Sequence, residues 1–192
     1  MADEGADSIP VLAIYDLHLR NHLAREFTDS YAVSAAVCMS RHHVPPMVWS
    51  VRLDARDSVD HLVEWEPPTP EHIRSCGNHD EATRDGAYGL ALAASDVHLD
   101  LVALGRAEGR TGADFYLVPA DAVDEGSLHF NLQPENRIRL EVSGIDRDDE
   151  AIMNARLNQK VRQAREGRSD LPALAVVVGF TTARVIFRTA VS

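Results

Sequence analysis

The feature that most constrains the fold is an uninterrupted apolar run, "ALAVVVGF", at residues 173–180. Continuous apolar strands are typical of sheets covered on both faces, whereas a strand with one wet face alternates. A helical pattern at residues 148–166 precedes the run, and residues 183–190 alternate as a neighbouring strand. We therefore expect an α/β protein with a mixed central sheet flanked by helices.

The segments upstream of this run extend the same pattern. Residues 80–99 are rich in Ala and Leu and open with Asp80 and Glu81, where the helix dipole favours acids, so they predict a helix. Three strand-like segments follow it, at residues 99–108, 113–119 and 137–144. The predicted order from residue 80 is helix, three strands, helix, strand, strand.

The helix predicted at residues 148–166 has start and stop signals. Asp146 or Asp148 is the candidate N-cap, and Gly167 follows the last turn. Its apolar stripe consists of Met153, Leu157, Val161 and Ala164.

The first part of the chain has a different pattern. Apolar residues recur at helical spacing over residues 9–41, and "HHVPP" ends this region because proline cannot continue a helix. Residues 47–53 alternate as a strand, and residues 61–70 form a second candidate strand that ends in prolines. We therefore divide the chain into a helical extension with one or two strands at residues 1–75 and a core at residues 76–192, packed as one compact unit.

Charge is unevenly distributed along the 192 residues, whose formal net charge is −11. Residues 1–80 hold 13 acids and 6 bases, whereas residues 150–192 hold 3 acids and 7 bases. The C-terminal helix and strands are therefore the candidate surface for nucleic acid, and the acidic part is the candidate surface for a basic protein. A second copy of the chain, as a homodimer, is the remaining candidate partner. Ordinary solvated charge is the simpler alternative.

The first residues are acidic, which is unlike a signal peptide, and no apolar stretch approaches the ~18 to 20 residues of a membrane span. These features predict a cytoplasmic protein without membrane contact.

Two cysteines and nearby histidines have the ligand types of a zinc site. The first pair is Cys38 with His42 or His43, and the second is Cys76 with His79. The spacing of 34 positions between the pairs (76−42) is unlike a compact zinc finger, and Cys38 follows apolar residues that favour burial. We therefore expect two reduced thiols and no zinc.

Acidic residues occupy particular places on the predicted element order. Glu81 lies on the first helix of the core, Asp114 opens the second strand, and Glu141 lies in the third. Together they resemble the restriction-endonuclease-like, or PD-(D/E)xK, superfamily, whose core is a helix, a three-strand meander, a crossover helix and a further strand. The resemblance covers about residues 79–190.

The resemblance implies a magnesium site. Asp114, Glu141 and the backbone carbonyl of Val142 would supply the hard oxygen ligands that Mg²⁺ prefers. The metal would polarise a phosphoryl oxygen and lower the pKa of a bound water, while Glu81 orients that water or a second ion. We expect the three carboxylates to lie about 4 to 8 Å apart.

The motif departs from the family at Ser143, where members carry a lysine that activates the water. Serine can donate a hydrogen bond but supplies no cation. Some members have this lysine on a neighbouring element, and Lys160, the only lysine of this chain, lies on the predicted crossover helix. Gln159 and Gln163 resemble the glutamines that many members carry there. The resemblance therefore implies Glu81, Asp114, Glu141 and Lys160 as catalytic residues, with Ser143, Gln159 and Gln163 as binding residues.

Each of these residues also has a simpler explanation. Glu81 is an ordinary first-turn helix acid, and Asp114 is a turn residue after glycine. Glu141 is an exposed strand residue paired with Arg137 or Arg139. Lys160, about 60° from the buried Leu157 on the helix, extends to water.

Two functions of different classes follow from the sequence. The first is a nuclease-like domain of a bacterial defence or mobile-element system, with Mg²⁺-dependent phosphodiester hydrolysis. The alternative is an inactive relative that acts as an acidic protein-binding module, like an antitoxin or immunity protein. The acidic residues favour the first, and the net charge and the missing lysine favour the second.

Overall fold

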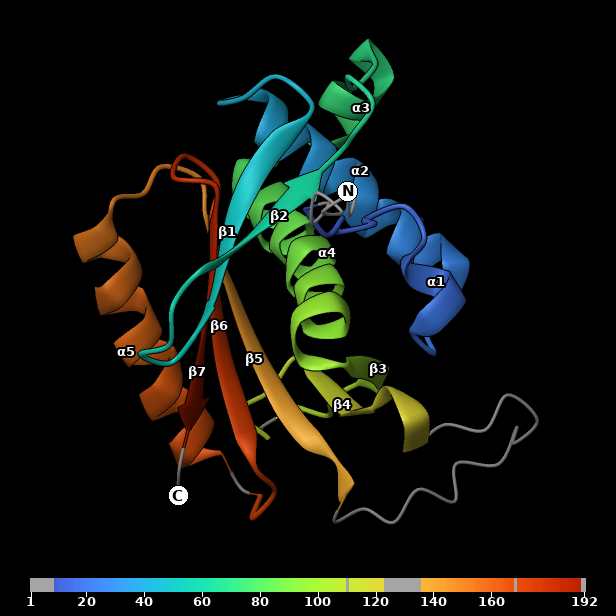
Figure 1. Ribbon diagram of the computed structural model, residues 1–192. Helices are drawn as coiled ribbons and strands as arrows, with labels where there is room; N and C mark the ends of the chain where they lie inside the picture. The colour runs from blue at the N-terminus through green and yellow to red at the C-terminus, as the bar shows by residue number, and fades with distance from the viewer. Residues whose placement is uncertain (1–8, 110, 123–135, 168, 191–192) are drawn as a thin grey trace, which may run out of the picture.

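The protein folds around one seven-stranded mixed sheet with helices on both faces (Figure 1). The computed structural model describes residues 9–109, 111–122, 136–167 and 169–190. Its strands are β1 (Met47–Leu53), β2 (Val59–Val63), β3 (Leu101–Arg106), β4 (Phe115–Pro119), β5 (Ile138–Ile145), β6 (Ala173–Gly179) and β7 (Arg184–Ala190). Its α-helices, within the described residues, are α1 (Leu17–Arg20), α2 (Arg25–Ser40), α3 (Pro70–Ser75), α4 (His79–Leu99) and α5 (Glu150–Glu166).

The strand order is β2-β1-β7-β6-β5-β4-β3. Two neighbouring pairs are parallel, β5 with β6 and β1 with β7, and the other four pairs are antiparallel. Helix α5 makes the crossover between β5 and β6. The α/β class and the predicted order from residue 80 onward are therefore confirmed.

Strand β6 explains why the apolar run is continuous. All seven of its residues are buried. Leu174, Val176 and Val178 belong to the core cluster that contains α4, whereas Ala175 and Val177 pack with the buried residues of α5. The strand is covered on both faces, as predicted.

Helix α5 begins later than predicted, because neither Asp146 nor Asp148 is its N-cap. Asp149 is the N-cap, and its Oδ1 accepts a hydrogen bond from the Ile152 amide at 2.8 Å. Asp148 instead accepts hydrogen bonds from the amides of Thr181 and Thr182 in the β6–β7 turn. The predicted apolar stripe of α5 is buried throughout.

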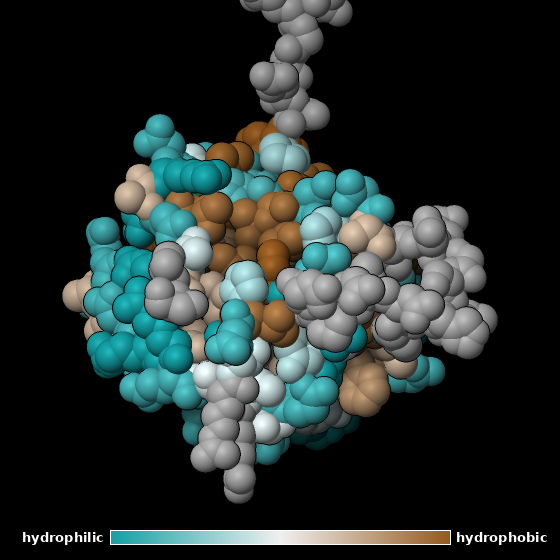
Figure 2. All heavy atoms as spheres, turned by 90° about the horizontal axis from the view of Figure 1, so that it is seen from below, coloured by the Kyte–Doolittle hydropathy of each residue, from teal (hydrophilic) through white to brown (hydrophobic). Residues whose placement is uncertain are grey.

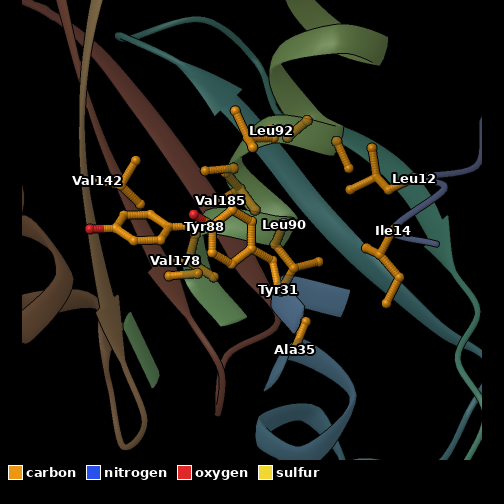
Figure 3. Close-up of a cluster of buried hydrophobic side chains, with 14 of the residues drawn as sticks. Leu12, Ile14, Tyr31, Ala35, Tyr88, Leu90, Leu92, Val142, Val178 and Val185 are labelled. Atoms are coloured by element: carbon orange, nitrogen blue, oxygen red, sulfur yellow. The ribbon is translucent and has the colours of Figure 1, made fainter. Parts of the chain in front are cut away.

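Helix α4 lies between the sheet and α2 (Figure 1). Gly144 of β5 allows α4 to come close, because a Cβ at this position would overlap the Thr83 carbonyl oxygen. The core between α4 and the sheet includes Leu12 and Ile14 from the start of the described chain (Figure 3).

The helix predicted over residues 9–41 is wrong in its first part. Residues 9–16 are not helical, and they lie beside β2, with hydrogen bonds from the Leu12 amide to Leu62 and from the Leu62 amide to Pro10. Leu12 and Ile14 are buried while Val11 is 44% exposed, which is the period of two of an extended chain. The spacings of four that predicted the helix begin only at Leu19, so the prediction was extended over residues that lack this pattern.

Strands β1 and β2 belong to the first 75 residues, yet β1 pairs with β7 in the same sheet as the core. The division of the chain at residue 75 stays a prediction.

Seen from below, hydrophilic residues cover most of the side on which α5 lies (Figure 2). Within the described residues, no helix combines the length and the apolar character needed to cross a membrane.

Candidate functional site

A pocket of about 930 Å³ lies between α4 and α5, along the second half of β5. It exists because β4 is short. The pairing of β4 with β5 ends at Phe115 opposite Leu140, so β5 beyond Leu140 has a neighbouring strand, β6, on one side only. The two helices cover the faces of this open edge, and side chains from both helices and from β5 line the space.

Asp114, directly before β4, bonds to the part of β5 that has no neighbouring strand on this side. Its Oδ2 accepts a hydrogen bond from the Val142 amide at 2.8 Å, which satisfies a backbone donor that no strand pairs. Its Oδ1 accepts a hydrogen bond from the Tyr88 hydroxyl of α4 at 2.7 Å. Figure 3 shows the Tyr88 side chain beside Val142. Burial and the charge of Asp114 raise the pKa of Tyr88, so this hydroxyl stays protonated and continues to donate.

Glu141 is in the middle of β5 and only 4% exposed. Lys160 of α5 donates a hydrogen bond from Nζ to Glu141 Oε1 at 2.6 Å, and its Nζ lies 3.3 Å from Gln163 Oε1. Burial raises the pKa of Glu141, repulsion from Asp114 also raises it, and the bond from Lys160 partly offsets both. The two carboxylates of the expected metal site are therefore close enough to repel one another.

The simpler explanations of Glu141 and Lys160 are wrong. Glu141 is buried, and Lys160, with a side chain only 16% exposed, pairs with it. Arg139, the expected partner of Glu141, is also buried and donates all its hydrogen bonds to backbone carbonyls of Thr111, Ala164 and Leu171.

Ser143 is 7% exposed and lines the pocket on the same face of β5 as Glu141. Arg156 of α5 reaches toward it, with Nη1 at 3.4 Å from Ser143 Oγ. Helix α5 therefore brings two cations, Arg156 and Lys160, to the strand end where the family resemblance implies one lysine.

The pocket face of α5 consists of Arg156, Lys160, Gln163 and Glu166, at helical spacings of four, three and three. Of the two glutamines predicted as binding residues, the structure brings only Gln163 to the pocket. Gln159 is exposed and lies outside the lining, because it is one position, about 100°, away from Lys160.

Glu81 does not join the other two carboxylates. It lines a separate pocket of about 380 Å³ between α2, α3 and α4, together with Asp29 and Asp85. Asp80 and Arg84, four residues apart on the adjacent face of α4, line the larger pocket instead. Among the residues that the structure describes, no group of three His, Cys, Asp or Glu side chains is arranged to hold a metal ion.

The residues considered for zinc have other neighbours. Burial raises the pKa of the Cys38 thiol to about 11, and the His42 ring lies 3.3 Å from Asp146. The Cys76 sulfur lies 3.9 Å from the Ser34 hydroxyl. Cys38, His42 and Cys76 are thus accounted for by packing and by contacts with nearby side chains.

Arg84, Tyr88 and Arg156 are among the pocket residues that sequence reasoning missed. The first two recur four residues apart after Asp80 on a helix that was predicted. Arg156 precedes Lys160 by four residues on the other predicted helix. Helical spacing from Lys160 was therefore an available signal for Arg156, whereas Asp80, from which the spacing to Arg84 and Tyr88 is counted, was not a predicted site residue.

Comparison with known proteins finds no match. No protein-family model fits the chain, and no curated protein and no solved structure is similar to it. The geometry of the pocket therefore carries the functional argument.

Proposed function

We propose that the protein is a Mg²⁺-dependent nuclease with a restriction-endonuclease-like core, of the kind expected in bacterial defence or mobile-element systems, in which Lys160 takes the role of the lysine that Ser143 replaces. The observation that carries the proposal is the contact of 2.6 Å between Lys160 Nζ and Glu141 Oε1, inside a pocket that also contains Asp114. A lysine on the crossover helix thus reaches the carboxylate of the third core strand.

The arrangement of the elements supports the same proposal. Helix α4, the antiparallel strands β3, β4 and β5, the crossover α5 and the parallel strand β6 follow in the order that the resemblance implies. Asp114 directly precedes the second of these strands, and Glu141 lies in the middle of the third.

The residues present fit a magnesium ion. Asp114 and Glu141 offer hard carboxylate oxygens, and Val142, whose carbonyl is the third expected ligand, lines the same pocket. Each carboxylate oxygen has two lone pairs, so the hydrogen bonds from Tyr88, Val142 and Lys160 leave acceptor capacity. A divalent ion there would relieve the repulsion between the two acids and, when bound, polarise a phosphoryl oxygen and lower the pKa of a coordinated water.

The protein side chains then have separate roles. Asp114 is held by two donors, so its carboxylate is oriented before substrate binds. Lys160 supplies a positive charge beside Glu141, where negative charge develops on the phosphate. Arg156 is exposed and can bind a non-bridging phosphate oxygen. Its guanidinium also places a positive charge beside Ser143, where the family's lysine would otherwise supply one.

A cleavage assay tests the proposal. The purified chain is incubated with double-stranded DNA, single-stranded DNA and RNA, with Mg²⁺ or with a chelator. We expect cleavage that requires Mg²⁺ and that falls roughly a hundredfold or more in Lys160→Ala. Gln159→Ala is the matched control, because it changes the adjacent exposed residue of α5 and should cleave like the wild type.

Thermal unfolding of each variant separates loss of activity from loss of fold. A wild type that cleaves none of the three substrates at any Mg²⁺ concentration would overturn the proposal and favour the inactive protein-binding alternative. Restoration of cleavage in Ser143→Lys would then identify a decayed site.

A further inference from the structure

A second, smaller pocket lies on the opposite flank of α5. It has a volume of about 270 Å³ and is lined by Ser50, Arg52, Ser58, Glu150, Arg184 and Ile186. We call it the β1–β7 pocket, because four of these residues lie on β1 and β7. The proposed nuclease makes no use of it.

Strand register places the two arginines on the same face of the sheet. Ser50 pairs with Arg184, and Arg52 pairs with Ile186, so Arg52 and Arg184 are diagonal neighbours. Ile186 belongs to the cluster under α5, which identifies this face as the α5 side. The alternating residues Trp49, Val51 and Phe187 are buried in the core on the other side.

Within the part of the chain that the structure describes, the two guanidinium groups lack hydrogen-bond partners, in contrast to those of Arg41 and Arg139. Among the described residues, neither Arg52 nor Arg184 makes a side-chain hydrogen bond or an ion pair. The Nε of Arg52 is buried and has no acceptor. By contrast, Arg139 uses Nε, Nη1 and Nη2 in hydrogen bonds to carbonyls.

Arg184 is exposed to solvent, so the free-energy cost of this arrangement lies mainly at the buried Nε of Arg52. A buried N–H without an acceptor is unfavourable, and two neighbouring like charges repel. Glu150 is the one carboxylate in the lining, and it pairs with neither arginine within ion-pair distance. An anion shared by the two guanidiniums would remove both penalties.

We propose that the β1–β7 pocket binds a phosphate group. Two guanidiniums and two serine hydroxyls offer more donors than the two oxygens of a carboxylate can accept, whereas a phosphate has at least three acceptor oxygens. Planar guanidinium groups also match phosphate geometry with paired hydrogen bonds. Glu150 limits the affinity, because its charge opposes that of the ligand.

The site is tested by titrating the full chain with inorganic phosphate at constant ionic strength, with chloride as the balancing salt. The resonances of arginine Nε–H groups in ¹H–¹⁵N spectra report directly on the unpaired donor. We expect the signals of Arg52 and Arg184 to shift and to saturate together. The Arg139 signal is an internal control, because its Nε is already bonded to Leu171.

Variants give the matching comparison. Arg52→Gln and Arg184→Gln should each weaken phosphate binding roughly tenfold or more, since each removes charge-assisted hydrogen bonds. Glu150→Gln should strengthen it. Arg162→Gln, an exposed position of α5 outside both pockets, should leave it unchanged. Circular dichroism of each variant verifies the fold.

Two results would overturn the proposal. One is a shift that stays linear in phosphate concentration, and the other is an equal loss of affinity in Arg162→Gln, which would indicate attraction to net charge alone.

A parallel titration with a short single-stranded oligonucleotide distinguishes the source of the phosphate. Tighter binding of the oligonucleotide that is lost in Arg52→Gln identifies a backbone phosphate, and tighter binding of inorganic phosphate identifies a free anion. Because neither arginine lines the larger pocket, failure of the cleavage assay would leave this site standing.

Discussion

Two buried charges lie two residues apart on β5, and their surroundings differ. Arg139 and Glu141 are both 4% exposed and point to the same face of the sheet. Arg139 makes four hydrogen bonds, all to carbonyl oxygens of the segments around it. Glu141 has one hydrogen bond, from Lys160, and faces a pocket.

The difference teaches how to separate a structural charge from a functional one. Arg139 joins the segment before β4, the end of α5 and the segment before β6, and four of its five N–H donors are used in these hydrogen bonds. Glu141 retains unused acceptor capacity beside a second carboxylate. Burial is equal in the two cases, so the partners, and not the exposure, distinguish them.

The strongest test of this comparison is Arg139→Met, which keeps much of the side-chain volume and removes the donors. We expect the free energy of unfolding to fall by roughly 3 to 5 kcal/mol, because one buried and two partly buried carbonyl groups lose their donor. Urea denaturation measures the change. The control is Arg165→Met on the exposed face of α5, which should cost less than about 0.5 kcal/mol. A loss equal to that of the control would show that Arg139 is not structural.

Tyr88→Phe should have an intermediate effect. It removes the hydroxyl that donates to Asp114 Oδ1, and we expect a loss of roughly 1 to 2 kcal/mol in the free energy of unfolding, because the bond is to a charged acceptor. If the pocket is a nuclease site, the rate of cleavage should fall as well, since Asp114 loses one of two positioning contacts.

A matched control exists for this variant. Tyr116 donates to Glu108 at 2.7 Å on the exposed surface, so Tyr116→Phe removes the same type of bond outside the pocket. It should change stability by less than about 0.5 kcal/mol and leave cleavage unchanged. Equal effects of the two variants would contradict a special role for Tyr88.

Glu141→Gln should have the smallest effect at neutral pH, within about 1 kcal/mol of wild type, with a characteristic pH dependence. The pKa of Glu141 is raised in the folded protein, so the folded state holds this proton more tightly than the unfolded state does. The contribution to stability is present below the ordinary glutamate pKa and is lost as pH rises through the raised value.

Glutamine resembles the protonated acid and should not show this loss. The stability of Glu141→Gln relative to wild type should therefore rise with pH above the ordinary glutamate pKa, as measured by urea denaturation at a series of pH values. A difference that is constant with pH, or that falls, would show that the ionised form of Glu141 is stabilised in the folded protein.

The sequence predicted the second half of the fold better than the first. The apolar run at residues 173–180 predicted a strand and the apolar stripe of α5 predicted a helix. Both predictions succeeded because each pattern follows directly from which residues are buried. The start of the chain failed because the helix was extended back over Leu12 and Ile14, whose spacing of two fits an extended segment and not one face of a helix. Its partner, β2, lies some 50 residues away, and local pattern contains no information about such pairing.

The candidate site was predictable in its residue types but less so in its geometry. Asp114, Glu141, Lys160 and Gln163 were chosen from the sequence and share one pocket. Glu81 was chosen by its position in the first turn of a helix, yet the direction of a side chain depends on how α4 is rotated against the sheet. That rotation is set by close contacts such as the one at Gly144, which only the packed structure reveals.

The pairing of β1 with β7 has a consequence for how the protein is made. Ser50 pairs with Arg184, which is 134 positions later in the chain (184−50). At about 5 to 20 residues per second, a ribosome needs roughly 7 to 27 seconds to make the intervening chain. During that time the β1–β2 hairpin has an unpaired edge, and an isolated hairpin is at best marginally stable. Trp49 and Val51 of β1 stay without their final neighbours until β7 emerges, so we expect the nascent chain to depend on a chaperone or on rapid late folding to avoid aggregation.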